Sequence, residues 1–219
     1  PIPALEPMID VWAPNIARYR ETEFQAQQLK GDSVWWYVCC GPGKPFANLM
    51  IEWPAVDHRI LLWQNWKYGV TGFLYWGTTV FRDNCEGEAR WPDVAWKPAT
   101  WRNSASQPHH GDGQLIYPGP DSTPLSSVRL ENLRDGIEDY EYFWLLREAV
   151  TGLERSGVTG HEELLAQARQ ALSVNESVVR DLKHFTDDPQ VLRRARTQIA
   201  RLIERLQAVH AKPTDTAPR

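Results

Sequence analysis

Two short runs of almost entirely apolar residues constrain the fold most. VWWYVCC at 34–40 and VTGFLYW at 70–76 are rich in β-branched and aromatic residues. Such runs are typical of strands covered on both faces, as in parallel sheets. A helical pattern at 54–68 separates them, and a shorter apolar run at 8–12 with a helical pattern at 16–30 precedes them. The order strand, helix, strand, helix, strand predicts an α/β fold with a parallel sheet.

The remainder of the sequence indicates a long loop followed by helices. Residues 77–126 show no sustained period and are expected to form a long loop, whereas helical spacing of apolar residues returns from Val128. Further helices are predicted at 162–182 and from Asp188-Pro189 to about 210, packed as an antiparallel hairpin. We therefore divide the chain into an aromatic-rich sheet region (1–126), a helix packed on it (127–150), a helical hairpin (151–211) and a frayed tail (212–219).

Charge and composition exclude several classes of function. The net charge of −4 provides no general attraction for nucleic acid or an anionic membrane, and no apolar run is long enough to span a bilayer. The start, Pro-Ile-Pro, has neither an initiator methionine nor a secretion signal, so we expect it to be cut from a longer chain. Cys39, Cys40 and Cys85 form no disulfide framework or zinc pattern and are expected to be reduced, packed thiols.

Tryptophan is strongly over-represented in the first half of the chain. Ten of the 11 tryptophans lie within residues 1–101. A core containing so many indoles would have to satisfy every indole N–H, so some of them are expected to line a ligand groove instead. The axial C–H faces of sugar rings stack well on such aromatic side chains. The pattern favours carbohydrate binding, with core packing as the alternative for each ring.

At this point the chain resembles a known family. The ordered runs MIDVWAPN, VWWYVCCGPGKPFANLMIEWP, ILLWQNWKYGVTGFLYW, GDGQLIYPGP and VRLENLRDGIEDYEYFWLL are similar to the C-terminal half of glycoside hydrolase family 123, the β-N-acetylgalactosaminidases, including the region named domain of unknown function 4091. The similarity spans about residues 8–147. It implies that the chain is the C-terminal portion of a (β/α)8 TIM barrel, with three parallel βα units followed by a helical segment.

The resemblance also implies a reaction. Family members cleave terminal N-acetylhexosamine by substrate-assisted catalysis, in which the 2-acetamido oxygen attacks the anomeric carbon, an Asp orients the acetamido group and an adjacent Glu is the general acid and base. No Asp-Glu pair occurs in this sequence, so no catalytic residue is assigned. The expected partners are a carbohydrate and either the missing N-terminal barrel half or a second copy of the chain. No cofactor is expected.

Candidate sugar-binding residues follow from barrel geometry, because working residues lie just past the carboxyl ends of the strands. Trp76 is the leading candidate for a stacking platform, while Tyr75 points the other way along the strand. For most of the others a packing or turn-forming role is an open alternative. The complete set is Trp12, Asn15, Tyr37, Asn48, Trp76, Asp112 and Tyr117.

Two further clusters receive structural interpretations. His109 and His110 are adjacent and cannot easily converge on one ion, so no metal site is expected. The acidic cluster around Asp139, beside Arg129 and Arg134, is predicted to form intrahelical pairs or a salt bridge from its helix to the barrel. The alternative to an enzyme is a non-catalytic module that binds carbohydrate or a partner chain.

Overall fold

The computed structural model describes residues 5–80, 102–104, 107–108, 110–119 and 123–210. It is an α/β structure with a parallel sheet of three strands in the order β1-β2-β3. These are β1 (Val11–Trp12), β2 (Ser33–Val38) and β3 (Gly72–Tyr75), so the three strands predicted from the sequence are confirmed with tighter bounds. Cys85, His109 and the tail at 212–219 lie outside the described residues.

Alternation along β2 separates the two faces of the sheet. Val34, Trp36 and Val38 are fully buried on the face that the helices cover, and the indole of Trp36 donates to the Asn65 side chain at 2.6 Å. Trp35 on the opposite face is 38% exposed. Leu74 of β3 pairs with Tyr37 and is 39% exposed. The strands were expected to be covered on both faces. Within the described residues this is wrong, because only one face of the sheet is covered.

Two helices connect these strands: α1 (Glu21–Lys30) and α2 (Ala55–Lys67). The predicted helix at 16–30 is interrupted, because Ile16–Arg18 form a 3-10 turn, η2, and Tyr19 is extended before α1 begins. Asn15 caps that turn by accepting from the Ala17 N–H at 3.1 Å. Gly31 ends α1 at φ 102°, the left-handed conformation that favours glycine at this position.

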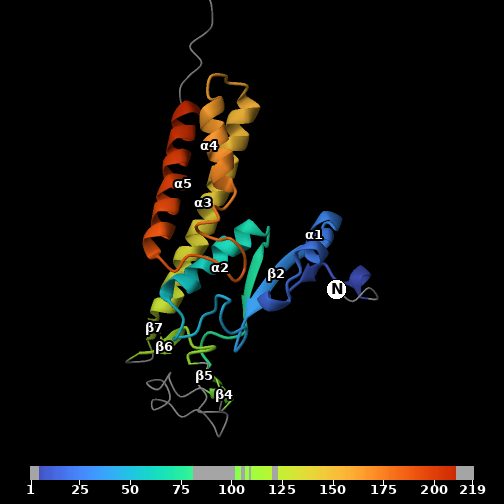
Figure 1. Ribbon diagram of the computed structural model, residues 1–219, viewed down its shortest axis with the longest axis vertical. Coiled ribbons are helices and arrows are strands. Elements are labelled where there is room, and N and C mark those ends of the chain that lie inside the picture. The colour runs from blue at the N-terminus through green and yellow to red at the C-terminus, as the bar shows by residue number, and fades with distance from the viewer. Residues whose placement is uncertain (1–4, 81–101, 105–106, 109, 120–122, 211–219) are drawn as a thin grey trace, which may run out of the picture.

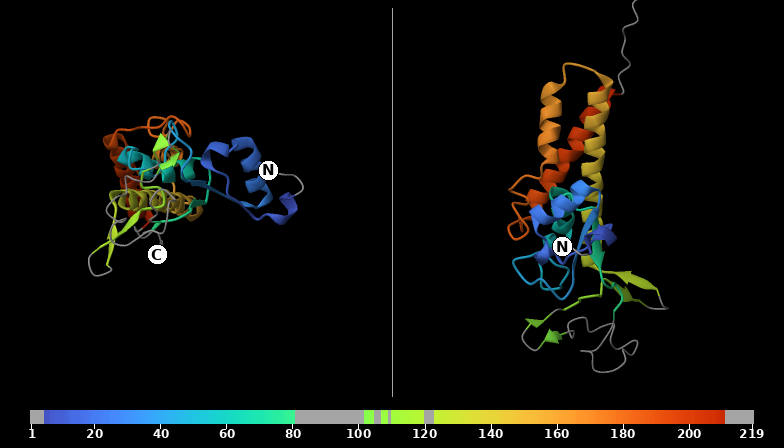
Figure 2. Two further views of the ribbon diagram at one scale, coloured as in Figure 1. Left: turned by 90° about the horizontal axis from the view of Figure 1, so that it is seen from below. Right: turned by 90° about the vertical axis from the view of Figure 1, so that its right-hand side faces the viewer.

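Three further helices run side by side along the long axis of the molecule (Figures 1 and 2). They are α3 (Val128–Ser156), α4 (Glu162–Leu172) and α5 (Pro189–His210). Ser127 caps α3 by accepting from the Leu130 N–H at 3.2 Å, and Gly157 ends it at φ 67°. The two last helices thus pack against α3 as well as against each other, and none of the described helices has the length and apolar character that a bilayer span requires.

The predicted helix at 162–182 is too long. α4 ends at Leu172, and residues 173–188 fold back as a loop because two side chains stabilise turns there. Asn175 accepts from the Ser177 N–H at 2.8 Å, and Asp181 accepts from the Lys183 N–H at 2.8 Å. The apolar residues that suggested a helix are buried all the same, since Val178 is 2% exposed.

The region predicted as one long loop contains two short antiparallel ladders. β4 (Arg102–Ser104) pairs with β5 (Gln107–Pro108), and β6 (Ile116–Pro118) pairs with β7 (Pro124–Ser126). Strands of two or three residues are too short to produce a recognisable alternation in the sequence. A 3-10 turn, η1 (Glu6–Met8), precedes β1.

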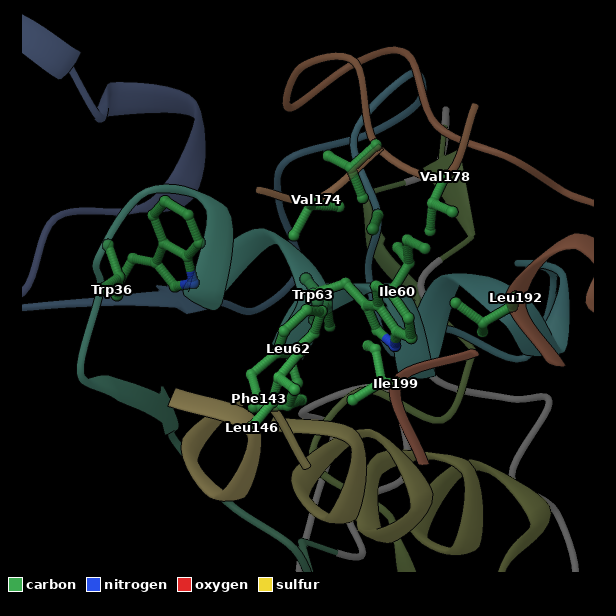
Figure 3. Packing of buried hydrophobic residues seen from close by; sticks show 14 of the residues in the cluster. Trp36, Ile60, Leu62, Trp63, Phe143, Leu146, Val174, Val178, Leu192 and Ile199 are labelled. Atoms are coloured by element: carbon green, nitrogen blue, oxygen red, sulfur yellow. The ribbon is translucent and has the colours of Figure 1, made fainter. Parts of the chain in front are cut away.

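The core lies between α2 and the helical bundle (Figure 3). Trp63 of α2 meets Phe143 of α3 edge to face, with ring centroids 4.9 Å apart. Asp139 of α3, fully buried, pairs with Arg59 of α2 at 2.6 Å and with Arg196 of α5 at 3.0 Å, and it accepts from the Trp63 indole at 2.7 Å. The predicted salt bridge from the acidic helix to the sheet region is confirmed.

Candidate functional site

A hydrogen-bonded polar cluster lies at the carboxyl end of β3. The Tyr75 hydroxyl and the Trp76 indole N–H both donate to Asp112 Oδ1, each at 2.9 Å. The Gly113 N–H in turn donates to the Tyr75 hydroxyl at 2.8 Å. Asp112 is 1% exposed, whereas Trp76 is 43% exposed. The arrangement therefore fixes an exposed aromatic ring through a buried carboxylate.

The turn that carries Asp112 requires glycine on both sides. Gly111 and Gly113 have φ angles of 77° and 74°, which side chains with a Cβ rarely adopt. Space is also lacking, because a Cβ on Gly113 would lie 2.8 Å from the Trp76 ring and one on Gly111 2.5 Å from the Arg129 guanidinium. Trp76 and Arg129 thus pack directly on the turn backbone.

Arg129, near the start of α3, binds the backbone of the turn that carries Asp112. It is 5% exposed and donates to the carbonyls of Leu49 at 2.8 Å and Gly111 at 2.6 Å, to the carbonyl of Gln114, and to the Tyr117 hydroxyl at 2.7 Å. The sequence interpretation placed Arg129 beside the acidic cluster of its helix, which is wrong.

The electrostatics keep Tyr75 a neutral donor. Burial raises the pKa of the Tyr75 hydroxyl well above its ordinary range, and the neighbouring Asp112 carboxylate raises it further. A hydroxyl that stays protonated can continue to donate to Asp112 at any physiological pH.

Tyr37 lies on the exposed face of the sheet. It pairs with Leu74, so these two side chains lie on the same face. Trp76 follows the end of β3, and the expectation that Tyr75 points away from it is wrong, because the Tyr75 hydroxyl and the Trp76 indole meet at Asp112. Trp35 lies further from the carboxyl end, with its indole across Gly72, where a Cβ would come within 2.3 Å of the ring. The exposed sheet face, defined by Trp35, Tyr37 and Leu74, is therefore largely aromatic, and the exposed Trp76 follows directly after β3.

The remaining candidates lie elsewhere. Trp12 is 8% exposed, packs edge to face on Phe24 and donates to Asp32 at 2.9 Å. Asn48 is 1% exposed and organises the loop after β2, donating to the carbonyls of Cys39 at 3.0 Å and Pro42 at 2.9 Å. The structure thus brings Trp76 and Asp112 together and links Tyr117 to their turn through Arg129. It places Tyr37 on the neighbouring strand, and Trp12 and Asn48 in packing and turn positions.

Asn15, the remaining candidate, lies between the ends of β1 and β2. Its side chain donates to the Gly41 carbonyl at 3.1 Å while capping η2, and its backbone bridges to that of Tyr37. It therefore joins the carboxyl ends of β1 and β2. Its amide is engaged in these structural bonds.

Two other features of the sequence interpretation can be located. His110 contacts the Glu52 carboxylate, and the described residues contain no group of three His, Cys, Asp or Glu side chains arranged for a metal. Cys39 and Cys40 follow the end of β2, and their sulfurs lie 3.8 Å apart. Both lie beyond β2, which ends at Val38.

His58 supports the loop that Arg129 also contacts. It is 3% exposed, and its Nε2 bonds the Met50 carbonyl at 3.2 Å, while Nδ1 is buried without a partner among the described residues. The pKa of His58 is lowered from 6.5 to about 4, chiefly by burial; Arg129 and Lys44 also lower it, while the hydrogen bond to Met50 raises it. The imidazole is therefore neutral in the folded protein at pH 7.

We expect the free energy of unfolding to fall by about 2 kcal/mol through His58 as the pH falls from 7 to 5. In this window the unfolded chain binds a proton at His58 and the folded chain does not, so acid favours unfolding. Urea titrations of the wild type and His58→Gln at both pH values measure the effect. Buried Asp57, whose pKa is raised by burial, acts in the opposite direction at lower pH. An equal pH dependence in both proteins would contradict the assignment.

A comparison with solved structures finds a similar fold. A solved structure titled "The details of glycolipid glycan hydrolysis by the structural analysis of a family 123 glycoside hydrolase from Clostridium perfringens" superposes with a TM-score of 0.57 at 17% identity. The alignment covers 94% of this chain and 34% of that one, so this chain spans about a third of the length of its structural neighbour. Among curated proteins, none matches.

The family itself is shown by its sequence model. The model described as "Glycoside hydrolase 123, catalytic domain" matches residues 6–146, well over half of the chain. The matched region includes the sheet, the Asp112 turn and α3 up to the Asp139 salt bridge and Phe143. The chain therefore belongs to glycoside hydrolase family 123.

Proposed function

We propose that this chain forms one wall of the sugar pocket in a glycoside hydrolase acting on terminal β-linked N-acetylhexosamine, specifically N-acetylgalactosamine. The observation that carries the proposal is the exposed Trp76 ring, held by its indole N–H to the buried Asp112 at the carboxyl end of the parallel strands. Working residues of parallel barrels occupy this end. A rigid aromatic ring beside hydrogen-bonding groups matches the alternating C–H and hydroxyl surface of a sugar.

The proposed reaction is retaining hydrolysis assisted by the substrate. The 2-acetamido oxygen attacks the anomeric carbon, an Asp orients the acetamido group, and an adjacent Glu protonates the leaving oxygen and then activates water. This sequence contains no adjacent Asp-Glu pair. We therefore assign that pair to residues outside this chain and give Trp76, Tyr37 and Tyr117 a role in binding and orienting the sugar.

The architecture we propose for the complete enzyme is a (β/α)8 barrel in which this chain supplies the last three βα units. Three strands leave two sheet edges, and such edges are normally paired or covered. Val11, Trp35 and Leu74 are 48%, 38% and 39% exposed on the open face, an apolar surface typical of a barrel interior. An N-terminal barrel half, or a second copy of the chain, would cover it.

We expect the isolated chain to show no hydrolysis of an aryl N-acetyl-β-galactosaminide, because it lacks the Asp-Glu pair. Release of the aryl alcohol measures turnover, with a longer protein that includes an upstream Asp-Glu pair as the positive control. Turnover by the isolated chain that is lost in Asp112→Asn would overturn this division of labour. Binding of N-acetylgalactosamine without turnover in either protein would instead identify a non-catalytic carbohydrate-binding module.

A further inference from the structure

A basic groove lies between α4 and α5, on the helical bundle. Its volume is about 520 Å³, and guanidinium groups dominate its lining. The lining residues are Arg193, Arg194, Thr197, Gln198, Arg201, Leu202 and Arg205 of α5 together with Gln167 of α4. We refer to this cavity as the arginine groove.

The charge of the arginine groove contrasts with that of the whole chain. The lining contains four arginines and no carboxylate, while the chain as a whole has a net charge of −4. The α5 segment has one acidic residue, Glu204, which does not line the groove. A concave surface with charges of one sign concentrates counter-ions of the opposite sign.

The arginines of α5 divide into two kinds. Arg196 points to the bundle interior and pairs with Asp139 at 3.0 Å and Glu138 at 3.2 Å. The four groove arginines form no ion pair within the part of the chain that the structure describes, and Arg205 donates only to the Gln167 side chain, at 3.1 Å. The bundle is therefore stabilised by Arg196, and the groove arginines remain available to a ligand.

We propose that the arginine groove binds an anionic polysaccharide, one whose repeating units carry sulfate or uronic carboxylate groups. Guanidinium groups recognise both anions through paired N–H bonds. The Gln167 and Gln198 amides can bond the hydroxyls between them. From Arg193 to Arg205 the helix rises about 18 Å, so an extended chain would meet a cation at nearly every turn.

The lining argues against other polyanions. Single-stranded nucleic acid is normally held by aromatic stacking as well as by charge, and no aromatic residue lines the groove. Binding at a lipid surface normally adds large apolar side chains that enter the bilayer interface. None of the exposed large apolar residues of the described chain lies on α4 or α5.

The groove is separate from the proposed sugar pocket. α4 and α5 occupy the end of the molecule opposite β6, near which the Asp112 turn lies (Figure 1). The proposal therefore stands whether or not the enzyme acts on N-acetylhexosamine. A polysaccharide held here would tether the enzyme to a charged glycan matrix.

The experiment measures binding of the full 219-residue chain to chondroitin sulfate by titration calorimetry at low and moderate salt. We expect the triple variant Arg193→Gln, Arg201→Gln and Arg205→Gln to bind at least tenfold more weakly and with a smaller salt dependence. The matched control replaces the exposed Arg18, Arg20 and Arg180, which lie outside the groove, by glutamine. It loses the same three positive charges as the groove variant. Circular dichroism establishes that both variants keep the helical content of the wild type.

Three outcomes would overturn the proposal. One is equal affinity in the wild type and the groove variant, and another is an equal loss in the control variant, which would indicate general charge attraction. The third is binding of a DNA oligonucleotide or of phosphatidylserine vesicles as tight as that of chondroitin sulfate and equally sensitive to the groove variant. Uncharged dextran is expected not to bind.

Discussion

Replacing Asp139 by alanine is expected to lower the free energy of unfolding by about 3–5 kcal/mol. The carboxylate is fully buried and compensates two cations from different helices, Arg59 and Arg196, while also accepting from the Trp63 indole. Removing it leaves Arg59 and Arg196 with only the partly exposed Asp135 and Glu138 as counter-charges, and it leaves one buried donor without an acceptor. Because these groups belong to α2 and α5, the loss would loosen the sheet region and the bundle together.

Glu138 supplies the control for this prediction. It is the neighbouring residue and also pairs with Arg196, at 3.2 Å, but its side chain is 47% exposed. Exposed pairs contribute about 0–1 kcal/mol, so Glu138→Ala should change the stability little. Urea unfolding followed by circular dichroism measures both variants. If Asp139→Ala lowered the free energy of unfolding no more than Glu138→Ala, the buried cluster would not be what joins the sheet region to the helical bundle.

The strands could be predicted because their signal is local. Each of the three is a run rich in β-branched and aromatic residues and bounded by Gly or Pro. The two segments between them have helical spacing. Covering on both faces could not be judged in the same way, since it depends on elements outside the run. Trp35 is as apolar as Trp36 but lies on the exposed face, and only the register with Gly72 and Phe73 distinguishes them.

Helix ends were predicted less well, for a related reason. The segment at 173–182 keeps apolar residues at helical spacing, but Asn175 and Asp181 each bond backbone N–H groups two residues ahead. Such side-chain bonds compete with helix formation. The apolar residues of this segment are still buried. The spacing therefore predicted their burial correctly but their helical conformation wrongly.

The candidate site was predicted in part. Trp76 and Asp112 were singled out by their places after a strand and between two glycines, and the structure joins them by a 2.9 Å hydrogen bond. Arg129 was missed, because its four partners are three carbonyls and a phenol that lie far away in the sequence. Long-range bonds to backbone leave no pattern in a single sequence. Asn48 has the turn-forming role that was the alternative to a sugar contact, because it donates to the carbonyls of Cys39 and Pro42 in its own loop.

Replacing Trp76 by alanine in the intact enzyme is expected to weaken transition-state binding by about 2 kcal/mol, which is roughly a 30-fold loss in kcat/KM. The ring is exposed and supplies the proposed stacking surface, while its indole fixes its orientation through Asp112. Trp76→Phe should retain much of the activity, because the stacking face remains. The fold should survive both changes, since an exposed side chain leaves little cavity.

Trp144 provides the matched comparison. It is a tryptophan of similar exposure, 39% against 43% for Trp76, but it lies on α3 against Arg147, whose guanidinium is 3.6 Å from its ring centroid. We expect Trp144→Ala to leave kcat/KM for an aryl N-acetyl-β-galactosaminide within about twofold, because no sugar contact is lost. Thermal unfolding of each variant separates loss of activity from loss of fold. Full activity in Trp76→Ala, or an equal loss in both variants, would remove Trp76 from the sugar pocket.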